Sequence, residues 1–526
     1  MVFNEASEPL EGEAVVSRLP LYALTVMDFR KPTTSLRSDA ALLSACAALI
    51  LVVHFLMGNG YGFHRDELQF LDDARHLHWG FVAYPPLTAF CGRLAIAVLG
   101  ISPQVFRLPA ALVNAGSLIL TGLIARELGG RKTGQIIALF AVFPLALAFS
   151  SVLQYNTFDL LAWLLIIFFT ARVLRTGEER YWIGVGVGIG IGVLSKYSIA
   201  FPVVSLLAAI VLLPTQRYHL RSRWFWYGAL TATIIASPNL IWLARHHFIT
   251  IRMEQFIHAR DVRHGRAEGY YADQIKVTLF AFPLAVGGLV SLVRSARFRL
   301  LSTFYIGPFV LFAVARGRGY YLMPAYPLLY AAGAVALEGL LAARARVLRF
   351  ALPCIVLTAM IVDAAGVAWA YLPLWPPGSP GWNWQMKNNH DMTDEIGWPE
   401  LVRQVASVRD TLPHEDRRRL AILANNYGEA GALSLYGPQY NLPTPISTTN
   451  SFHDRGFGPY QPETVIVLGG ELHDQELNFE HCAVAAQVSI PFGVRNEESV
   501  DHPEILICHH LRRPWAEVWK QSQEFG

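Results

Sequence analysis

The chain has 526 residues, of which 53% are hydrophobic and only 16% are charged. Soluble domains carry about 25% charged residues, so this composition indicates a membrane protein and excludes an ordinary soluble one. The net charge of +3 comes from basic residues scattered along the chain, which does not support nucleic-acid binding. About 40 polar residues precede the first apolar stretch, so no cleavable signal peptide is evident and that stretch is expected to be an uncleaved anchor.

Apolar segments long enough to cross a bilayer, about 17–25 residues each, recur along the first 371 residues. The run 181–213 is too long for one helix and is expected to divide near Lys196, whereas 300–315 is short. Counted this way, the sequence predicts about eleven transmembrane helices. The segments are 40–57, 105–127, 133–150, 157–174, two within 181–213, 224–243, 274–293, 300–315, 320–342 and 350–371.

The basic connections between these segments predict their sidedness, because basic residues near span ends favour the cytoplasm. All of them fall inside if the amino terminus is inside and the short apolar segment 86–99 does not cross. We therefore expect 86–99 and 65–79 to be interfacial helices within one large outer loop, 58–104. The basic connections are 126–132, 172–180, 217–223, 294–299 and 344–349.

The sequence predicts three parts: a cytoplasmic tail over 1–39, a transmembrane domain over 40–371 and an extracytoplasmic α/β domain over 372–526. In the last part, Cys482 and Cys508 could form a disulfide if the domain lies outside the cell, and the sequence leaves this open. Its expected helices are near 399–411, 428–436 and 515–521, and its expected strands are near 420–424, 464–468, 483–489 and 504–508.

Two adjacent acids, Asp66 and Glu67, follow the first span closely. One interpretation is structural: carboxylates suit the cap and first turn of a helix beginning there. The other is catalytic, with Asp66 as a general base and Glu67 orienting it or the acceptor. The residues alone favour neither. Asp72 and Asp73, one to two turns further on, are expected on a solvated face.

Cations are less expected at the outer ends of spans, and several residues there are candidates for a phosphate-binding pocket. Arginine offers a bidentate fork and lysine a point charge, although snorkelling side chains would explain each residue alone. The candidates are Lys196, Arg316 and Arg318, with Tyr320 and Tyr321 as possible hydroxyl donors. An acid within a span, Asp159, is costly and hence a further candidate. The histidines of the loop 244–273 fit no tight zinc motif, so no metal site is expected.

Together the acids and cations suggest transfer from a lipid phosphate. A phosphate leaving group needs only charge stabilisation, whereas an acceptor hydroxyl needs a base. A sugar carried on a polyprenyl phosphate would therefore require no further cofactor and no nucleotide-binding motif. Direct attack by the acceptor would invert the anomeric centre.

Several motifs resemble those of the polyprenyl-phosphate-dependent glycosyltransferases with the GT-C fold, which include protein O-mannosyltransferases and lipid A aminoarabinose transferases. They are spread over most of the chain. The motifs are HRDELQFLDDARHLHWGFVAYPPL from His64, VFRLPAAL at 105–112, LSKYS at 194–198, RGRGYYLMPAYPLL at 316–329 and NYGEAGALSLYGP at 426–438.

The resemblance implies an inverting transferase at the outer face of the plasma membrane, with Asp66 as base and Glu67 beside it. It places Lys196, Arg318 and Tyr321 against the donor phosphate. The predicted supporting residues are His64, Arg65, Tyr84 and Asp159. The aminoarabinose transferases carry Glu-Lys before the two prolines, where this chain has Ala83-Tyr84, so neither that sugar nor a lipid A acceptor is carried over; the acceptor hydroxyl is on a lipid, glycan or protein.

Two other classes remain open from the sequence. A polytopic transporter or lipid flippase would share the spans and Asp159, but has no need of an outer pair of acids or a long exposed tail. A surface-binding scaffold would use the tail to recognise a partner, while the acids cap a helix.

Overall fold

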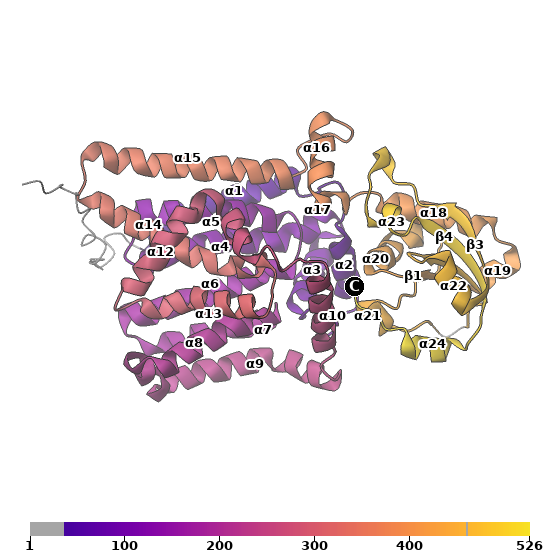
Figure 1. Cartoon of the computed structure of the whole chain (residues 1–526), viewed down its shortest axis with the longest axis horizontal. Helices are drawn as coiled ribbons and strands as arrows, with labels where there is room; N and C mark the ends of the chain where they lie inside the picture. The colour runs from indigo at the N-terminus through magenta and orange to yellow at the C-terminus, as the bar shows by residue number, and fades with distance from the viewer. Residues whose placement is uncertain (1–35, 459–460) are drawn as a thin grey trace, which may run out of the picture.

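The computed structural model of the protein describes residues 36–458 and 461–526. Figure 1 shows an elongated bundle of helices with a smaller domain, which contains the sheet, at one end. The predicted tail 1–39 lies almost wholly outside the described residues. The sequence-based prediction of a helical membrane protein with a small carboxy-terminal sheet domain is confirmed.

Each of the eleven predicted spans is helical in the structure. The run 181–213 divides at Leu194–Lys196, as its length required. The bundle helices are α1 (Leu36–Met57), α4 (Pro103–Glu127), α5 (Lys132–Ser150), α6 (Tyr155–Thr176), α7 (Trp182–Val193), α8 (Ala200–Leu212), α9 (Arg223–Arg245), α11 (Tyr270–Thr278), α12 (Phe282–Arg294), α13 (Thr303–Val314), α14 (Tyr326–Ala342) and α15 (Arg346–Tyr371).

Within the described residues, eight helical stretches are long and apolar enough to cross a membrane. A ninth is counted if the helices 197–212 and 214–221, which meet at a bend of 106°, form one span. The segment 299–314 is apolar but shorter. The protein is therefore a multi-pass membrane protein, while the expected number of eleven spans stays a prediction.

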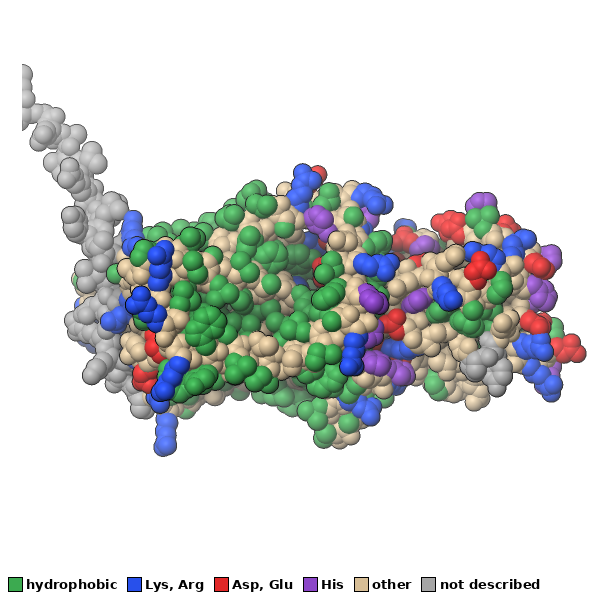
Figure 2. All heavy atoms as spheres, turned by 90° about the horizontal axis from the view of Figure 1, so that it is seen from below, with side chains coloured by type: hydrophobic (Ala, Val, Ile, Leu, Met, Phe, Trp, Pro, Cys, Tyr) green, Lys and Arg blue, Asp and Glu red, His purple; other side chains and the backbone are tan. Residues whose placement is uncertain are grey.

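The two ends of the bundle differ in charge. Figure 2 shows hydrophobic side chains over the middle of the bundle, with Lys and Arg gathered at the end away from the sheet domain. The connections at that end include 343–345 between α14 and α15. This connection contains the exposed Arg344 and is followed by the exposed Arg346 and Arg349. This basic connection thus lies at the end of the bundle opposite the sheet domain.

Short helices fill the junction between the bundle and the sheet domain. They are α2 (Arg65–Arg75), α3 (Leu87–Leu99), α10 (Ile249–Arg263), α16 (Pro380–Asn388) and α17 (His390–Thr393). The apolar side of α2 is buried inside the protein, with Leu68 and Ala74 fully covered, and does not face a headgroup layer. A side chain at Gly431 of the sheet domain would come within 2.7 Å of Leu68, so the domain packs directly on α2.

This packing contradicts the expectation that Asp72 and Asp73 face solvent. Both are buried. Arg455 of the sheet domain forms ion pairs with both, and Ser434 donates a hydrogen bond to Asp72. The physical reason is that these acids lie on the side of α2 that the domain covers, where burial is tolerated because each carboxylate has a partner.

The sheet domain has four strands in the order β1-β2-β4-β3. β1 and β2 are parallel, and the other two pairs are antiparallel. Cys482 and Cys508 face each other across β3 and β4, with their Cα atoms 4.1 Å apart, and form a disulfide. The elements are α18 (Trp398–Thr411), α19 (His414–Arg418), β1 (Leu420–Ala424), α20 (Tyr427–Tyr436), α21 (Asn450–His453), β2 (Thr464–Leu468), α22 (Leu472–Asn478), β3 (Phe479–Gln487), α23 (Glu497–Val500), β4 (Glu504–Leu511) and α24 (Trp515–Gln521).

Candidate active site

A cavity of about 1050 Å³ lies at the junction between the bundle and the sheet domain. Pockets for drug-sized ligands measure about 300–1,000 Å³, so this one has room for more than one small substrate. Its walls come from α2 and the loop 58–104, from the ends of bundle helices that face the sheet domain, from α10 and from the sheet domain. Segments far apart in the sequence therefore share one site.

Asp66 lies in this cavity at the start of α2. The helix begins there because the ring of His64 accepts a hydrogen bond from the backbone N–H of Asp66 as its amino-terminal cap. One carboxylate oxygen of Asp66, Oδ1, accepts from the hydroxyl of Tyr427 at 2.9 Å, and the other, Oδ2, lies 3.4 Å from the amide nitrogen of Gln154. The carboxylate thus faces the cavity and is held from two sides.

Glu67 takes a different direction and does not line the cavity. It is fully buried, and Arg107 binds both of its oxygens, with Nη2 2.7 Å from Oε2. The backbone N–H of Leu153 donates to Oε1 at 2.9 Å. Arg107 also contacts Glu395 at 3.2 Å. The two acids of the motif are therefore brought to one helix turn, but only Asp66 is placed to meet a substrate.

Lys196 lies on the opposite wall, in the break between α7 and α8. Its ammonium is 4.6 Å from the ring centre of Tyr321, 5.4 Å from that of Tyr155 and 5.7 Å from that of Tyr320. Such a cage stabilises a cation by its contact with ring faces. Lys196 also donates to Asn156 at 2.8 Å.

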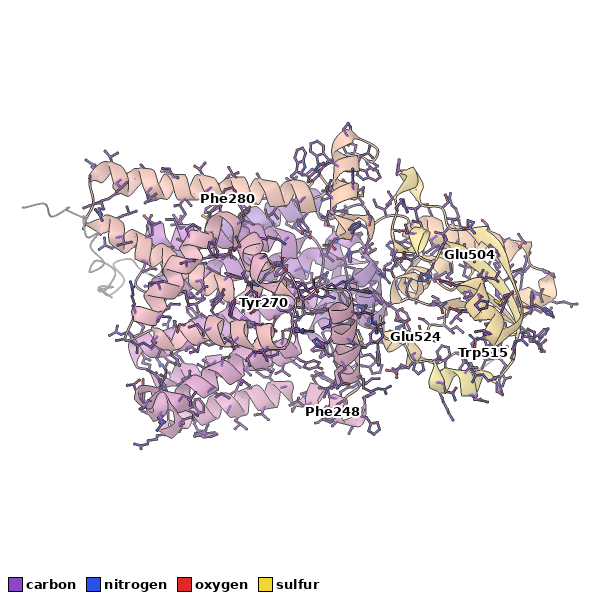
Figure 3. All side chains as sticks on the ribbon, in the orientation of Figure 1. Phe248, Tyr270, Phe280, Glu504, Trp515 and Glu524 are labelled. Carbon is purple, nitrogen blue, oxygen red and sulfur yellow. A yellow bond between two sulfur atoms is a disulfide. The ribbon has the colours of Figure 1, made fainter. Side chains whose placement is uncertain are left out.

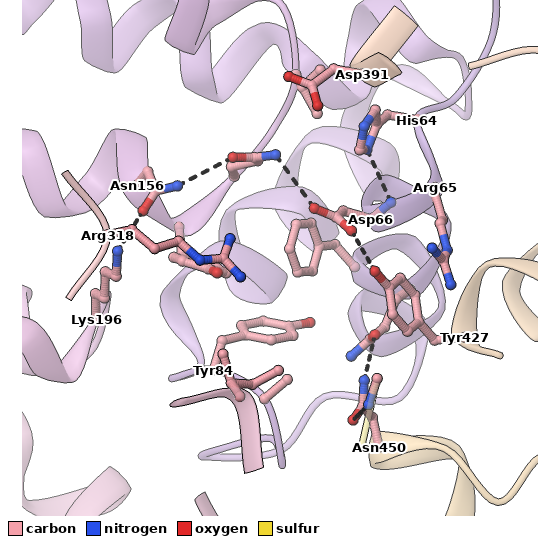
Figure 4. Close-up of a pocket in the computed structure, with 18 of the residues that line it drawn as sticks. His64, Arg65, Asp66, Tyr84, Asn156, Lys196, Arg318, Asp391, Tyr427 and Asn450 are labelled. Atoms are coloured by element: carbon pink, nitrogen blue, oxygen red, sulfur yellow. Dashed lines mark hydrogen bonds between the residues drawn. The ribbon is translucent and has the colours of Figure 1, made fainter. Parts of the chain in front are cut away.

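A chain of polar side chains joins the two walls. From Lys196 it runs through Asn156 to Gln154, whose amide oxygen is 3.3 Å from the Asn156 nitrogen, and from Gln154 to Asp66 (Figure 4). Gln154 and Asn156 flank the start of α6. The start of this helix therefore fixes the spacing between the lysine and the carboxylate.

Arg318 and Arg316 have different surroundings. Arg318 lines the cavity and makes a two-pronged ion pair with Asp261 of α10, with both N–O distances 2.5 Å. Arg316 is exposed and lines a smaller cavity next to Tyr270, away from Asp66. Of the two predicted arginines, only Arg318 shares the cavity of Lys196.

The supporting residues named from the sequence differ in whether they line the cavity. Arg65 lines the cavity, forms an ion pair with Glu497 and lies 4.7 Å above the ring of Tyr427. Tyr84 lines the cavity too, and donates to the buried Asp73 at 2.7 Å. Asp159 is buried in α6 and does not line the cavity.

The structure adds cavity residues that sequence reasoning missed. Arg260 of α10 and Arg266 beyond it line the cavity beside Arg318, and Arg266 lies 3.4 Å from Asp261. The signal was present, because these arginines stand in the same outer loop where cations are less expected. Tyr427 carried no local signal for a contact with Asp66, since 361 residues separate them. Burial, and next the charge of Asp66, raise the pKa of Tyr427 and keep its hydroxyl a donor.

Among residues 36–458 and 461–526, no three His, Cys, Asp or Glu side chains lie together as metal ligands. His246, one of the outer-loop histidines, instead stacks on Trp242 with ring centres 4.0 Å apart.

Comparison with known proteins identifies the class. Residues 83–242 match the family model of dolichyl-phosphate-mannose-protein mannosyltransferase. No curated protein matches the chain in sequence. ArnT from Cupriavidus metallidurans bound to undecaprenyl phosphate has a similar fold, with 13% identity, a TM-score of 0.54, and coverage of 90% of this chain and 98% of that one. Its apo state gives 12% identity, a TM-score of 0.56 and the same coverage.

An Archaeoglobus fulgidus oligosaccharyltransferase reaches a TM-score of 0.49 at 12% identity, over 77% of this chain and 64% of that one. The matched family model and the shared fold define the chain as a membrane glycosyltransferase. Within that class it has the GT-C fold, as the sequence motifs indicated. The transporter and scaffold interpretations find no support in these comparisons.

Proposed function

We propose that the chain is an inverting glycosyltransferase that moves a sugar from a polyprenyl phosphate to an acceptor hydroxyl at the outer face of the plasma membrane. The observation that carries this proposal is one cavity with the carboxylate of Asp66 on one wall and Lys196, with Arg318 near it, on the other; Arg260 lines the same cavity. The donor class has further support from the undecaprenyl phosphate bound to ArnT, which shares this fold.

In the proposed reaction, the acceptor oxygen attacks the anomeric carbon from the face opposite the phosphate. The new carbon–oxygen bond forms as the bond to the phosphate oxygen breaks, and the electron pair of that bond leaves with the phosphate. Asp66 takes the hydroxyl proton. Lys196 and the arginines stabilise the charge that gathers on the leaving phosphate, and the ring cage limits where the ammonium can lie.

The remaining predicted residues receive separate roles in this proposal. Glu67 is a positioning residue, because its ion pair with Arg107 fixes the turn that carries Asp66. Tyr320 and Tyr321 hold Lys196 in place. Arg318 adds positive charge to the donor end, although it also forms an ion pair with Asp261. Arg316, which is exposed outside the cavity, is left without a role at the donor phosphate.

We propose that the sheet domain, 372–526, is extracytoplasmic and that 40–371 is the catalytic membrane domain. Two observations support this sidedness. The basic connection 343–345 and the Lys and Arg side chains gathered at its end of the bundle lie opposite the sheet domain, and basic residues favour the cytoplasm. The Cys482–Cys508 disulfide belongs to an oxidising compartment.

The test is the Asp66→Asn variant of the full chain, which keeps the size of the side chain and removes the base. Lipid-linked sugars are extracted from a strain that lacks the gene, where mass spectrometry names the one that accumulates. We expect transfer from that donor to the strain's envelope fraction to fall by a factor of about 10² to 10⁴, the usual contribution of a general base. Undecaprenyl phosphate should still bind. Transfer at the wild-type rate would remove the base from the mechanism.

A further inference from the structure

The two ends of the cavity differ in the charge of the side chains that line them. The end formed by the bundle and α10 carries four basic residues against the acids Glu254 and Asp261. These basic residues are Lys196, Arg260, Arg266 and Arg318. At the other end, the described residues from 372–526 that line the cavity include no lysine or arginine; their acidic members are Asp391, Glu395, Glu497 and Glu524. Figure 3 shows Glu524 at the junction of α10 and the sheet domain.

Neutral amides and hydroxyls make up much of the sheet-domain wall. Asn425, Asn426, Thr449 and Asn450 all line the cavity. Asn426 caps α20 by accepting from the backbone of Glu429 at 2.8 Å, which fixes the helix that presents Tyr427. Thr449 donates to the backbone oxygen of Asn425 at 2.9 Å and ties the two loops together. The wall is therefore a built surface, held by hydrogen bonds within the domain.

This wall is continuous with the base. Tyr427 of the wall donates to Asp66, and Asn450 donates to Gln69, one turn along α2, at 3.2 Å. Figure 4 shows Tyr427 and Asn450 on the side of Asp66 away from Lys196 and Arg318. A molecule on this wall could thus present a hydroxyl to Asp66 while the donor phosphate occupies the basic end.

The chemistry of the wall selects a class of acceptor. Amide side chains both donate and accept hydrogen bonds, as sugar hydroxyls do. Arg65 of α2 also lines this end, but it is already engaged by Glu497. A phosphate-bearing acceptor would in addition meet Glu524 and Asp391, and like charges disfavour such binding. A peptide that bound by adding a strand beside β1 would find that edge occupied, because Ile446 already pairs with Leu423 there.

Resting on the proposed function, we propose that this wall, the amide wall of Asn425, Asn426, Thr449 and Asn450, is the acceptor subsite and that it binds the neutral, polyhydroxylated end of a glycan. The acids beside it select against phosphorylated acceptors. The anionic donor thereby binds at the basic end of the cavity, and the neutral acceptor binds at the amide wall.

The experiment measures candidate acceptors and the donor lipid on the same purified full chain. Saturation-transfer NMR compares neutral disaccharides such as mannobiose and galactobiose with their 6-phosphates and with a Ser/Thr-containing peptide. Native mass spectrometry measures undecaprenyl phosphate separately. We expect contact with at least one neutral disaccharide, and at least tenfold weaker contact with its phosphate and with the peptide.

The variants separate the two ends of the cavity. Asn425→Ala should weaken neutral-sugar binding about tenfold, the equivalent of one lost hydrogen bond of about 1.4 kcal/mol, and leave undecaprenyl phosphate bound. Asn478→Ala, on α22 outside the cavity, is the matched control and should change neither. The double variant Glu524→Gln and Asp391→Asn removes two negative charges. It should reduce the difference in affinity between the neutral disaccharide and its 6-phosphate.

The outcomes distinguish this proposal from the proposed function. Preferred binding of the phosphates or of the peptide, or neutral-sugar binding that Asn425→Ala leaves unchanged, overturns the amide wall as acceptor subsite while the donor site stands. Failure of undecaprenyl phosphate to bind, with the chain folded, instead overturns the donor assignment. Binding of no saccharide in the presence of bound undecaprenyl phosphate also rejects the acceptor class named here.

Discussion

At the scale of single residues, the candidate base is held by two parts of the chain. Tyr427 of the sheet domain and Gln154 of the bundle each contact one oxygen of Asp66. A carboxylate fixed in this way has little freedom to turn from the acceptor, and correct orientation is a large part of general-base efficiency. The sequence made Asp66 and Lys196 candidates from local context, but the contacts of Asp66 with residues 88 and 361 positions away carry no local pattern.

Tyr427→Phe tests the orientation of the base. Losing one hydrogen bond to a charged group should lower kcat about tenfold, with the KM for the donor unchanged. Tyr436→Phe, at the other end of α20, is the control and should behave as wild type. An unchanged kcat for Tyr427→Phe, measured with the accumulated lipid-linked sugar, would show that Tyr427 does not position Asp66.

Lys196→Met tests the donor end. Removing the caged ammonium should weaken undecaprenyl phosphate binding about tenfold or more, because hydrogen bonds to charged groups contribute about 1.5–3 kcal/mol. Native mass spectrometry gives the affinity. Lys387→Met, an exposed lysine on α16, controls for the loss of one positive charge; if both variants bind equally well, Lys196 does not contact the phosphate.

At the scale of elements, α2 depends on a buried network beneath its first turn. Glu67, Arg107 and Glu395 are all at most 4% exposed, and Arg107 binds both acids. The sequence predicted a helix here from its apolar spacing, and that helix exists. Its burial was missed because spacing shows that a helix has an apolar face and does not show which element covers it. The strand and helix positions in the tail followed well from alternation, whereas their sheet order depends on contacts between distant segments.

Arg107→Met should destabilise the fold strongly. It leaves two carboxylates buried without their cation, and breaking a buried pair costs about 3–5 kcal/mol. The thermal midpoint of the full chain in detergent should drop by several degrees. Arg93→Met on the neighbouring α3, an exposed arginine, should leave the midpoint unchanged. Equal midpoints for the two variants would contradict the structural role of the network.

At the scale of the whole molecule, the junction between the bundle and the sheet domain holds buried acids. Burial raises the pKa of Glu429 to about 8 and that of Glu498 to about 7. The charge of Glu498 raises the pKa of Glu429 further, and Arg65 acts in the opposite direction on both groups. These groups line the underside of the domain that covers α2. The junction should therefore respond to pH.

The direction of that response follows from proton linkage. Between about pH 5 and pH 8, the folded chain keeps a proton on Glu429 that the unfolded chain releases, so the free energy of unfolding falls as pH rises. The slope for one proton is at most about 1.4 kcal/mol per pH unit. Glu429→Gln should flatten the pH dependence of the thermal midpoint across this window. Glu480→Gln, on the exposed strand β3, is the control and should leave the pH dependence of the thermal midpoint unchanged. If Glu429→Gln also leaves it unchanged, Glu429 is not the group that makes stability depend on pH.

The contact between Tyr427 and Asp66 has a consequence for biosynthesis. A ribosome makes Asp66 early and Tyr427 only 361 residues later. A nascent chain therefore inserts its helices long before its reactive centre is complete. Under the proposed function, activity begins late, when the sheet domain has emerged and docked on α2, so a prematurely terminated product would occupy the bilayer without transferring sugar.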